Sequence, residues 1–126
     1  MSGSMRSPLR KRLIWIGSSK EDLRAMPVTL QKEFGVALDL VQQGLTPDGA
    51  KLLKGRQKGA VQLSEDYRGD TFRAVYTVQF ETEVYVLHCF QKKAKKGAAT
   101  PKADLDLIET RLKAARKIHS QLREEK

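Results

Sequence analysis

Cationic side chains at two places in the chain could bind the phosphates of a nucleic acid. Arg73 falls in the middle of a segment, residues 71–80, whose alternation of residue types predicts a β-strand. A guanidinium held on a strand presents planar donors that match phosphate oxygens in pairs. Five lysines and no acidic residue then occur between Gln91 and Lys102, namely Lys92, Lys93, Lys95, Lys96 and Lys102. Because lysines that neutralise phosphates release counterions, this cluster indicates a surface for nucleic acid.

Both features also have an explanation that involves no ligand. A lysine-rich loop can serve only to keep a small protein in solution. Arg73 can form a cross-strand ion pair with Glu65 or Glu83, because stranding its charge in the core would be costly. The sequence alone leaves these alternatives open.

Three further side chains are candidates for the same surface. Lys51 and Lys54 frame an apolar pair just before the predicted strands, so they could flank the sheet face that carries Arg73 or lie in a solvated loop. Phe90, at a strand end beside the lysines, could stack on a base, although burial in the core is the commoner outcome for such a ring.

The composition excludes several classes of protein. The 126 residues include 24 Lys or Arg and 15 Asp or Glu, which gives a formal charge of +9 and a pI of about 9.9. One cysteine, Cys89, and two separated histidines, His88 and His119, predict neither a disulfide nor a metal site, and no cofactor is expected. No apolar run approaches the ~18 residues needed to cross a bilayer. We therefore expect a basic, cytoplasmic protein without a membrane partner.

The hydrophobic pattern predicts an α+β fold with the order β-α-α-β-β-β-α. Residues 13–16 are short, apolar and partly β-branched, which is typical of a strand. Ser18 and Glu21 have the spacing of a capping box, and Pro27 suits the start of a second helix, so two helices are expected within residues 20–43. Residues 45–59 are expected to be a loop.

Three closely spaced strands and a long helix should complete the chain. Residues 60–66, 71–80 and 83–91 predict an antiparallel meander, with the third strand central because it is apolar on both faces. His88 is expected to be a hydrogen-bonded core residue on the same side of that strand as Val86 and Phe90. Thr100–Pro101 should cap and begin the final helix. We expect residues 1–9 to be a partly disordered leader and residues 10–126 to be one domain.

Several motifs, taken together and in this order, resemble a known family, the phage-derived Gp49-like branch of HigB toxins. That branch belongs to the RelE/ParE superfamily of type II toxin–antitoxin systems. The motifs are Leu13-Ile-Trp-Ile-Gly-Ser-Ser19, Lys51-Leu-Leu-Lys-Gly55, Phe72-Arg-Ala-Val-Tyr76, Val86-Leu-His-Cys-Phe-Gln-Lys-Lys93 and Thr100-Pro-Lys-Ala-Asp104. The resemblance extends from about Arg10 to Ile118, so it implies a RelE-like fold for nearly the whole chain.

The resemblance implies an mRNA interferase that cuts transcripts on the ribosome and is restrained by an antitoxin, commonly a helix-turn-helix protein of the HigA type. Cleavage in the superfamily proceeds by attack of the RNA 2′-OH on the adjacent phosphate. By resemblance, Arg73 contacts the scissile phosphate, Lys92 or Lys93 supplies an acid or phosphate clamp, and Lys54 is a candidate base. The resemblance also implies that Phe90 and Gln91 position the nucleotide. Lys51, Lys95 and Lys96 are RNA-binding candidates because of their charge and position.

Two other functions remain open. ParE-type relatives poison DNA gyrase and do not cleave RNA. Many relatives also carry an arginine in the first strand of the meander, where this chain has Gln62-Leu63-Ser64. That departure is consistent with a basic domain that binds nucleic acid without cutting it.

Overall fold

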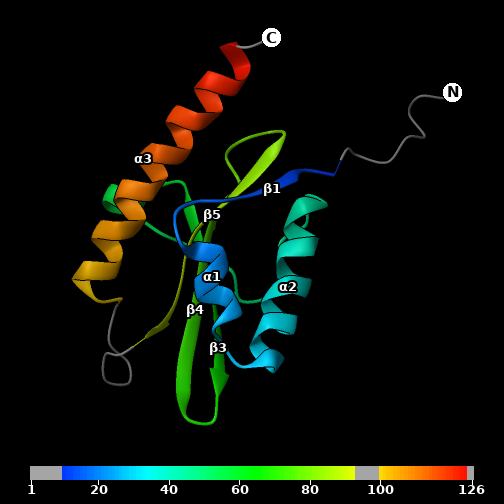
Figure 1. Cartoon of the computed structure of the whole chain (residues 1–126), viewed down its shortest axis with the longest axis vertical. Helices are drawn as coiled ribbons and strands as arrows, with labels where there is room; N and C mark the ends of the chain where they lie inside the picture. The colour runs from blue at the N-terminus through cyan, green and yellow to red at the C-terminus, as the bar shows by residue number, and fades with distance from the viewer. Residues whose placement is uncertain (1–9, 93–99, 125–126) are drawn as a thin grey trace, which may run out of the picture.

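The computed structural model describes residues 10–92 and 100–124, in which one mixed sheet lies between two layers of helices (Figure 1). Helices α1 and α2 cover one face of the sheet, and α3 crosses the other. The elements are β1 (Arg12–Trp15), α1 (Ser19–Arg24), α2 (Val28–Gln42), β2 (Lys51–Leu52), a 3₁₀ turn η2 (Gly55–Gln57), β3 (Ala60–Tyr67), β4 (Asp70–Thr77), β5 (Glu83–Lys92) and α3 (Lys102–Glu124). This arrangement confirms the α+β fold and is compatible with a RelE-like fold. Residues 1–9, the expected leader, lie outside the described part of the chain.

The sheet has the order β1-β5-β4-β3-β2. Strand β1 pairs in parallel with β5, whereas β3, β4 and β5 form the predicted antiparallel meander. The first eight residues of β5 are all buried, as expected for a strand with neighbours on both sides and helices on both faces. The predicted loop before the meander contains β2, whose two residues extend the sheet beside β3.

A tight turn sets the register of β3 against β4. Arg68 and Gly69, between the two strands, have φ values of 52° and 87°, which is the left-handed combination of a type I′ hairpin turn. Such turns match the right-handed twist of the paired strands. The turn places Ser64 directly opposite Arg73, a pairing that matters for the candidate site.

A bulge in β5 changes which residues face α3. Val75 pairs with His88, but the next residue of β4, Tyr76, pairs with Val86, so Leu87 is the extra residue. Val86 therefore belongs to the core under α1 and α2, while the His88 side chain contacts α3. The expectation that Val86 and His88 share a face was wrong, because strict alternation fails across a bulge.

Two details at the ends of elements also differ from the sequence predictions. Ser18 precedes α1 but forms no capping hydrogen bond to the backbone, since its Oγ donates to the Asp22 carboxylate at 2.7 Å. Strand β4 ends at Thr77, three residues earlier than expected. Phe80 then leaves the sheet alternation and packs its ring on His119 of α3, with the ring centres 4.2 Å apart.

Helix α3 is fastened to the sheet along its length by polar contacts as well as by its apolar stripe. The buried stripe consists of Ile108, Leu112 and Ala115. The polar contacts reach the α3 residues Asp104, Leu105, Arg111, Arg116 and His119. Arg111 passes directly over Gly17, where a Cβ atom would lie 2.9 Å from the guanidinium. Glycine at this position, with φ of 57°, therefore permits the turn after β1 and the close approach of α3.

Candidate functional site

Arg73 lies in β4 on the sheet face that carries α3, directly between Ser64 of β3 and Phe90 of β5. Its side chain is held by Thr100, two residues before α3. The Nη1 atom donates to the Thr100 hydroxyl at 2.6 Å, and that hydroxyl donates in turn to Oε1 of Gln62 at 3.2 Å. Partial burial lowers the pKa of Arg73 below its usual value, because removing water disfavours the charged form.

The charge of Arg73 has no carboxylate partner among the described residues. Glu83, one predicted partner, accepts from His119 at the far end of β5, at 2.9 Å. Glu65, the other, is paired with Phe72 and so faces α2, where burial and the neighbouring Glu33 raise its pKa. The Nε atom of Arg73 is buried and has no hydrogen-bond partner in the described part of the chain. The cross-strand ion pair is therefore not present, and the guanidinium remains available to an anion.

The structure brings two of the candidate lysines to the same face. Lys92 is the last residue of β5 and pairs with Thr71, two pairs beyond Arg73 and Phe90 and therefore on the same face. Lys51 of β2 pairs with Gln62 and is exposed. Lys54 precedes the 3₁₀ turn, and no hydrogen bond or ion pair among the described residues joins it to Arg73. The remaining candidates of the lysine cluster, Lys93, Lys95 and Lys96, lie outside the described residues.

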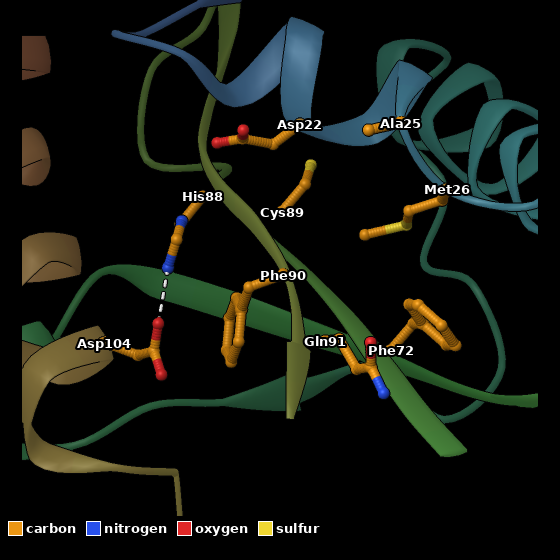
Figure 2. A pocket seen from close by; sticks show the side chains of 9 residues that line it. All are labelled: Asp22, Ala25, Met26, Phe72, His88, Cys89, Phe90, Gln91 and Asp104. Atoms are coloured by element: carbon orange, nitrogen blue, oxygen red, sulfur yellow. Dashed lines mark hydrogen bonds and ion pairs between the residues drawn. The ribbon is translucent and has the colours of Figure 1, made fainter. Parts of the chain in front are cut away.

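A cleft of about 440 Å³ opens over the edge of β5 (Figure 2). Strand β1 pairs only with the first residues of β5, as far as Val86, so the second half of β5 has no strand neighbour on that side within the described chain. Phe72 and Met26 lie on one side of β5, and His88 and Asp104 lie on the other. The other lining residues are Asp22, Ala25, Cys89, Phe90 and Gln91.

His88 and Asp104 form the polar side of the cleft. The Nε2 atom of His88 lies 2.7 Å from Oδ1 of Asp104, near the start of α3. The imidazole stacks on Phe90 with the ring centres 4.4 Å apart, and only 6% of His88 is exposed. This confirms the prediction of a hydrogen-bonded interior histidine. Its Nδ1 atom is buried without a partner in the described chain, so the pair with Asp104 is the polar contact that fixes the ring.

A comparison with known protein families shows to which family this chain belongs. The model of the family described as Phage derived protein Gp49-like (DUF891) matches residues 21–113. The chain belongs to this family. It is a family of HigB/RelE-like toxins, and membership implies an antitoxin partner. No curated protein and no solved structure gives a significant match to the chain.

The region that matches the Gp49-like family contains the whole candidate site. It begins in α1 and ends in the first half of α3, so it includes Arg73, the cleft, Lys92 and Thr100. It leaves out β1 and the last turns of α3.

The described part of this Gp49-like chain has neither a candidate metal cluster nor a membrane-spanning helix. Among the described residues, no three His, Cys, Asp or Glu side chains cluster in a way that could hold a metal ion. No described helix is long and apolar enough to cross a membrane. Burial raises the pKa of the Cys89 thiol to about 12, as expected for a small interior side chain.

Several residues of the site were not found from the sequence. Thr100 was expected to cap α3, but its hydroxyl holds Arg73 from 27 residues away. Asp104 was not connected with His88. Of the other cleft residues, Asp22 lies in α1 and Met26 in the link between α1 and α2, and neither segment contains a motif for binding. The only sequence signal for Thr100 was its place in a motif of the family resemblance, since neither charge nor periodicity marks it.

Proposed function

We propose that this protein is the toxin of a type II toxin–antitoxin system and cleaves mRNA on the ribosome. The observation that carries the proposal is the state of Arg73, which is fixed by Thr100, half-buried and not neutralised by any described carboxylate. A preorganised cation in such a place stabilises charge that develops on phosphorus, and it needs no reorganisation during the reaction. Membership in a family of HigB/RelE-like toxins supports the proposal that the protein is a toxin.

The proposed reaction is attack of an RNA 2′-OH on the adjacent phosphate, which expels the 5′-oxygen of the next nucleotide. Arg73 binds the equatorial oxygens of the phosphate. Lys92 and Lys93 are proposed to clamp the phosphate or to protonate the leaving oxygen, and Lys54 is proposed to accept the 2′-OH proton. Arginine and lysine suit the phosphate-binding roles because their positive charge is opposite to that of the phosphate. We further propose that the cluster Lys51, Lys95 and Lys96, with Phe90 and Gln91, binds the flanking RNA.

Ser64 shapes this site by being small. It is exposed and directly opposite Arg73, at the position where many relatives carry arginine. Cβ atoms of such pairs lie about 5 Å apart, so an arginine at this position would share the same phosphate. The chain is therefore proposed to rely on Arg73 as the one guanidinium of the described phosphate site.

The test is brief induction in bacteria followed by mapping of new mRNA 5′ ends. Wild-type protein is expected to produce cuts within translated frames, and Arg73→Ala to abolish them. Lys113→Ala is the matched control, because Lys113 is an exposed cation on α3 whose charge pairs only with Glu109. If Arg73→Ala cuts as well as wild type while folded, Arg73 is not in the site.

Other outcomes of the same experiment identify the alternatives. Growth arrest without new 5′ ends would indicate a different target, such as DNA gyrase, which a supercoiling assay would then detect. An absence of both arrest and cuts would indicate an inactive domain that binds nucleic acid. We also propose a helix-turn-helix antitoxin of the HigA type as partner, and a cytoplasmic location together with the ribosome. Co-expression with a cognate antitoxin should restore growth.

A further inference from the structure

The bulge in β5 decides which side chains of this strand lie on the same face as Arg73. Because Leu87 is an extra residue, Phe90 pairs with Arg73, and Lys92 lies on the same face two residues further along. A regular ladder without the extra residue would place Cys89 opposite Arg73. Phe90 and Lys92 would then lie on the other face of the sheet, toward α1 and α2. The bulge therefore brings two of the proposed RNA-contacting residues to the face of Arg73.

The bulge lies where β5 loses its neighbour on the β1 side. Among the described residues, the last backbone hydrogen bond between these strands joins the Ile16 N–H to the Val86 carbonyl at 3.0 Å. The chain then turns away from β5 at Gly17. An extra residue interrupts the ladder, and a backbone carbonyl in the interior needs a donor. Leu87 is fully buried, so its carbonyl requires a donor from another part of the fold.

Arg111 of α3 provides this donor. Its Nη1 atom donates to the Leu87 carbonyl at 2.9 Å, and its Nη2 atom donates to the Ser18 hydroxyl at 3.2 Å. The guanidinium occupies the space beside Gly17, where an ideal Cβ atom would lie 2.9 Å from Cζ, Nε and Nη2. One side chain therefore joins α3, the turn after β1 and the bulge of β5.

We infer that Arg111 is a positioning residue for the proposed reaction. It fixes the bulge at Leu87 and so keeps Phe90 and Lys92 on the face of Arg73. A residue that only fastened α3 would act on the docking of the whole helix, whereas this role concerns the second half of β5. The inference rests on the proposed function for its effect on cleavage, but the effect on β5 is measured on the protein alone.

Amide hydrogen exchange of the full-length protein tests the effect on β5. Arg111→Met keeps an aliphatic stem and removes both donors. Loss of a hydrogen bond from a charged donor to the bulge should make the amides of residues 88–92 exchange about tenfold faster. Amides of residues 83–86, which pair with β1, and those of α3 should exchange as in wild type. Arg116→Met is the matched control, because Arg116 of the same helix donates to a different backbone carbonyl, that of Lys58, at 3.1 Å.

A second pair of variants disturbs the same contact while Arg111 is retained. In Gly17→Ala the added methyl group takes the place of the guanidinium and displaces it from the Leu87 carbonyl. Exchange in residues 88–92 should therefore rise as it does in Arg111→Met. Gly49→Ala is the control, because Gly49 also has a positive φ, 79°, but nothing lies within 4 Å of its ideal Cβ atom. This pair decides the question if Arg111→Met does not fold.

Single-turnover cleavage of an mRNA on purified ribosomes tests the effect on the reaction. Arg111→Met should lower the rate about tenfold, because Phe90 and Lys92 are no longer held beside Arg73. Arg111→Lys restores one charged donor of similar reach and should bring the rate to within about threefold of wild type. Arg116→Met should cleave at the wild-type rate.

Three results would overturn the inference. The first is unchanged exchange in residues 88–92 in both Arg111→Met and Gly17→Ala. The second is faster exchange spread evenly over α3 and both halves of β5, which would reflect loss of helix docking alone. The third is faster exchange confined to residues 88–92 with no change in cleavage, because the bulge would then not serve the reaction.

The outcomes also separate this inference from the proposed function. If no protein cuts mRNA, wild type included, the proposed function fails. The exchange measurements still decide in that case whether Arg111 fixes the bulge of β5.

Discussion

Replacing Thr100 with valine tests whether the site depends on how Arg73 is held. Valine has nearly the same shape as threonine but cannot accept from the guanidinium at 2.6 Å or donate to Gln62 at 3.2 Å. A hydrogen bond to a charged group contributes about 1.5–3 kcal/mol net, and one between neutral groups about 0.5–1.5 kcal/mol. Because Thr100 is only half-buried, the lower values apply. Together they predict that the free energy of unfolding falls by about 2 kcal/mol.

The same substitution should affect cleavage more than binding. If the bond of about 1.5 kcal/mol serves to hold Arg73 in the geometry for the transition state, its loss lowers the cleavage rate about tenfold. The assay is single-turnover cleavage of an mRNA bound to purified ribosomes, with thermal unfolding measured in parallel. Thr100→Ser keeps the hydroxyl and should retain most of the rate.

A second control distinguishes lost orientation from lost stability. Val41→Ala removes about 2 kcal/mol from the core under α2, where Val41 is buried on the sheet face opposite Arg73 and Thr100. It should therefore cleave at the wild-type rate below its melting temperature. If Thr100→Val cleaves as fast as wild type, or if Val41→Ala is equally impaired, the reasoning about Arg73 is refuted.

Three further predictions concern the rest of the molecule. Cys89, whose buried thiol has a pKa of about 12, should react with iodoacetamide at pH 8 at least about a hundredfold more slowly in the folded protein than in denaturant; comparable rates would contradict its burial. Since the folded pKa of Glu65 is raised from 4.5, its stabilising effect is present below pH 4.5 and is lost as pH rises through the folded value. Glu65→Gln should thus raise the free energy of unfolding at pH 7 by ~0.5 kcal/mol and reduce its dependence on pH; an unchanged pH dependence would contradict the effect of burial and of Glu33. Leu112 is fully buried on the face of α3 that packs against the sheet, so Leu112→Ala should lower the free energy of unfolding by about 2–5 kcal/mol. A loss below about 1 kcal/mol in urea titration would contradict this packing.

The sequence predicted those parts of the fold that local patterns determine. The meander was predicted from the alternation in residues 71–77 and from the continuous apolar run of β5. Both patterns reflect which side chains of each strand are buried. Pro27 likewise stands immediately before the second helix, α2. The bulge at Leu87 was not predicted. Nothing in the residue types of Leu87 and His88 indicates that β5 has an extra residue relative to β4 at this point.

The candidate site was predicted only in its charges. Arg73 and Lys92 were found because a cation in or at the end of a strand is unusual in itself. The contacts from Arg73 to Thr100 and from His88 to Asp104 join segments 27 and 16 residues apart, and they exist only after α3 docks. Tertiary contacts of this kind leave no periodicity in the chain, so pattern analysis does not detect them.

The dependence of Arg73 on Thr100 has a consequence for biosynthesis. On a ribosome the chain emerges from its N-terminus, so the meander that carries Arg73 can fold while Thr100 and α3 are still inside the exit tunnel. At that stage the guanidinium lacks its anchor, and α3 has not yet been fastened by Arg111 and His119. Under the proposed function, a nascent chain would therefore cleave the message that encodes it more slowly until synthesis has passed α3.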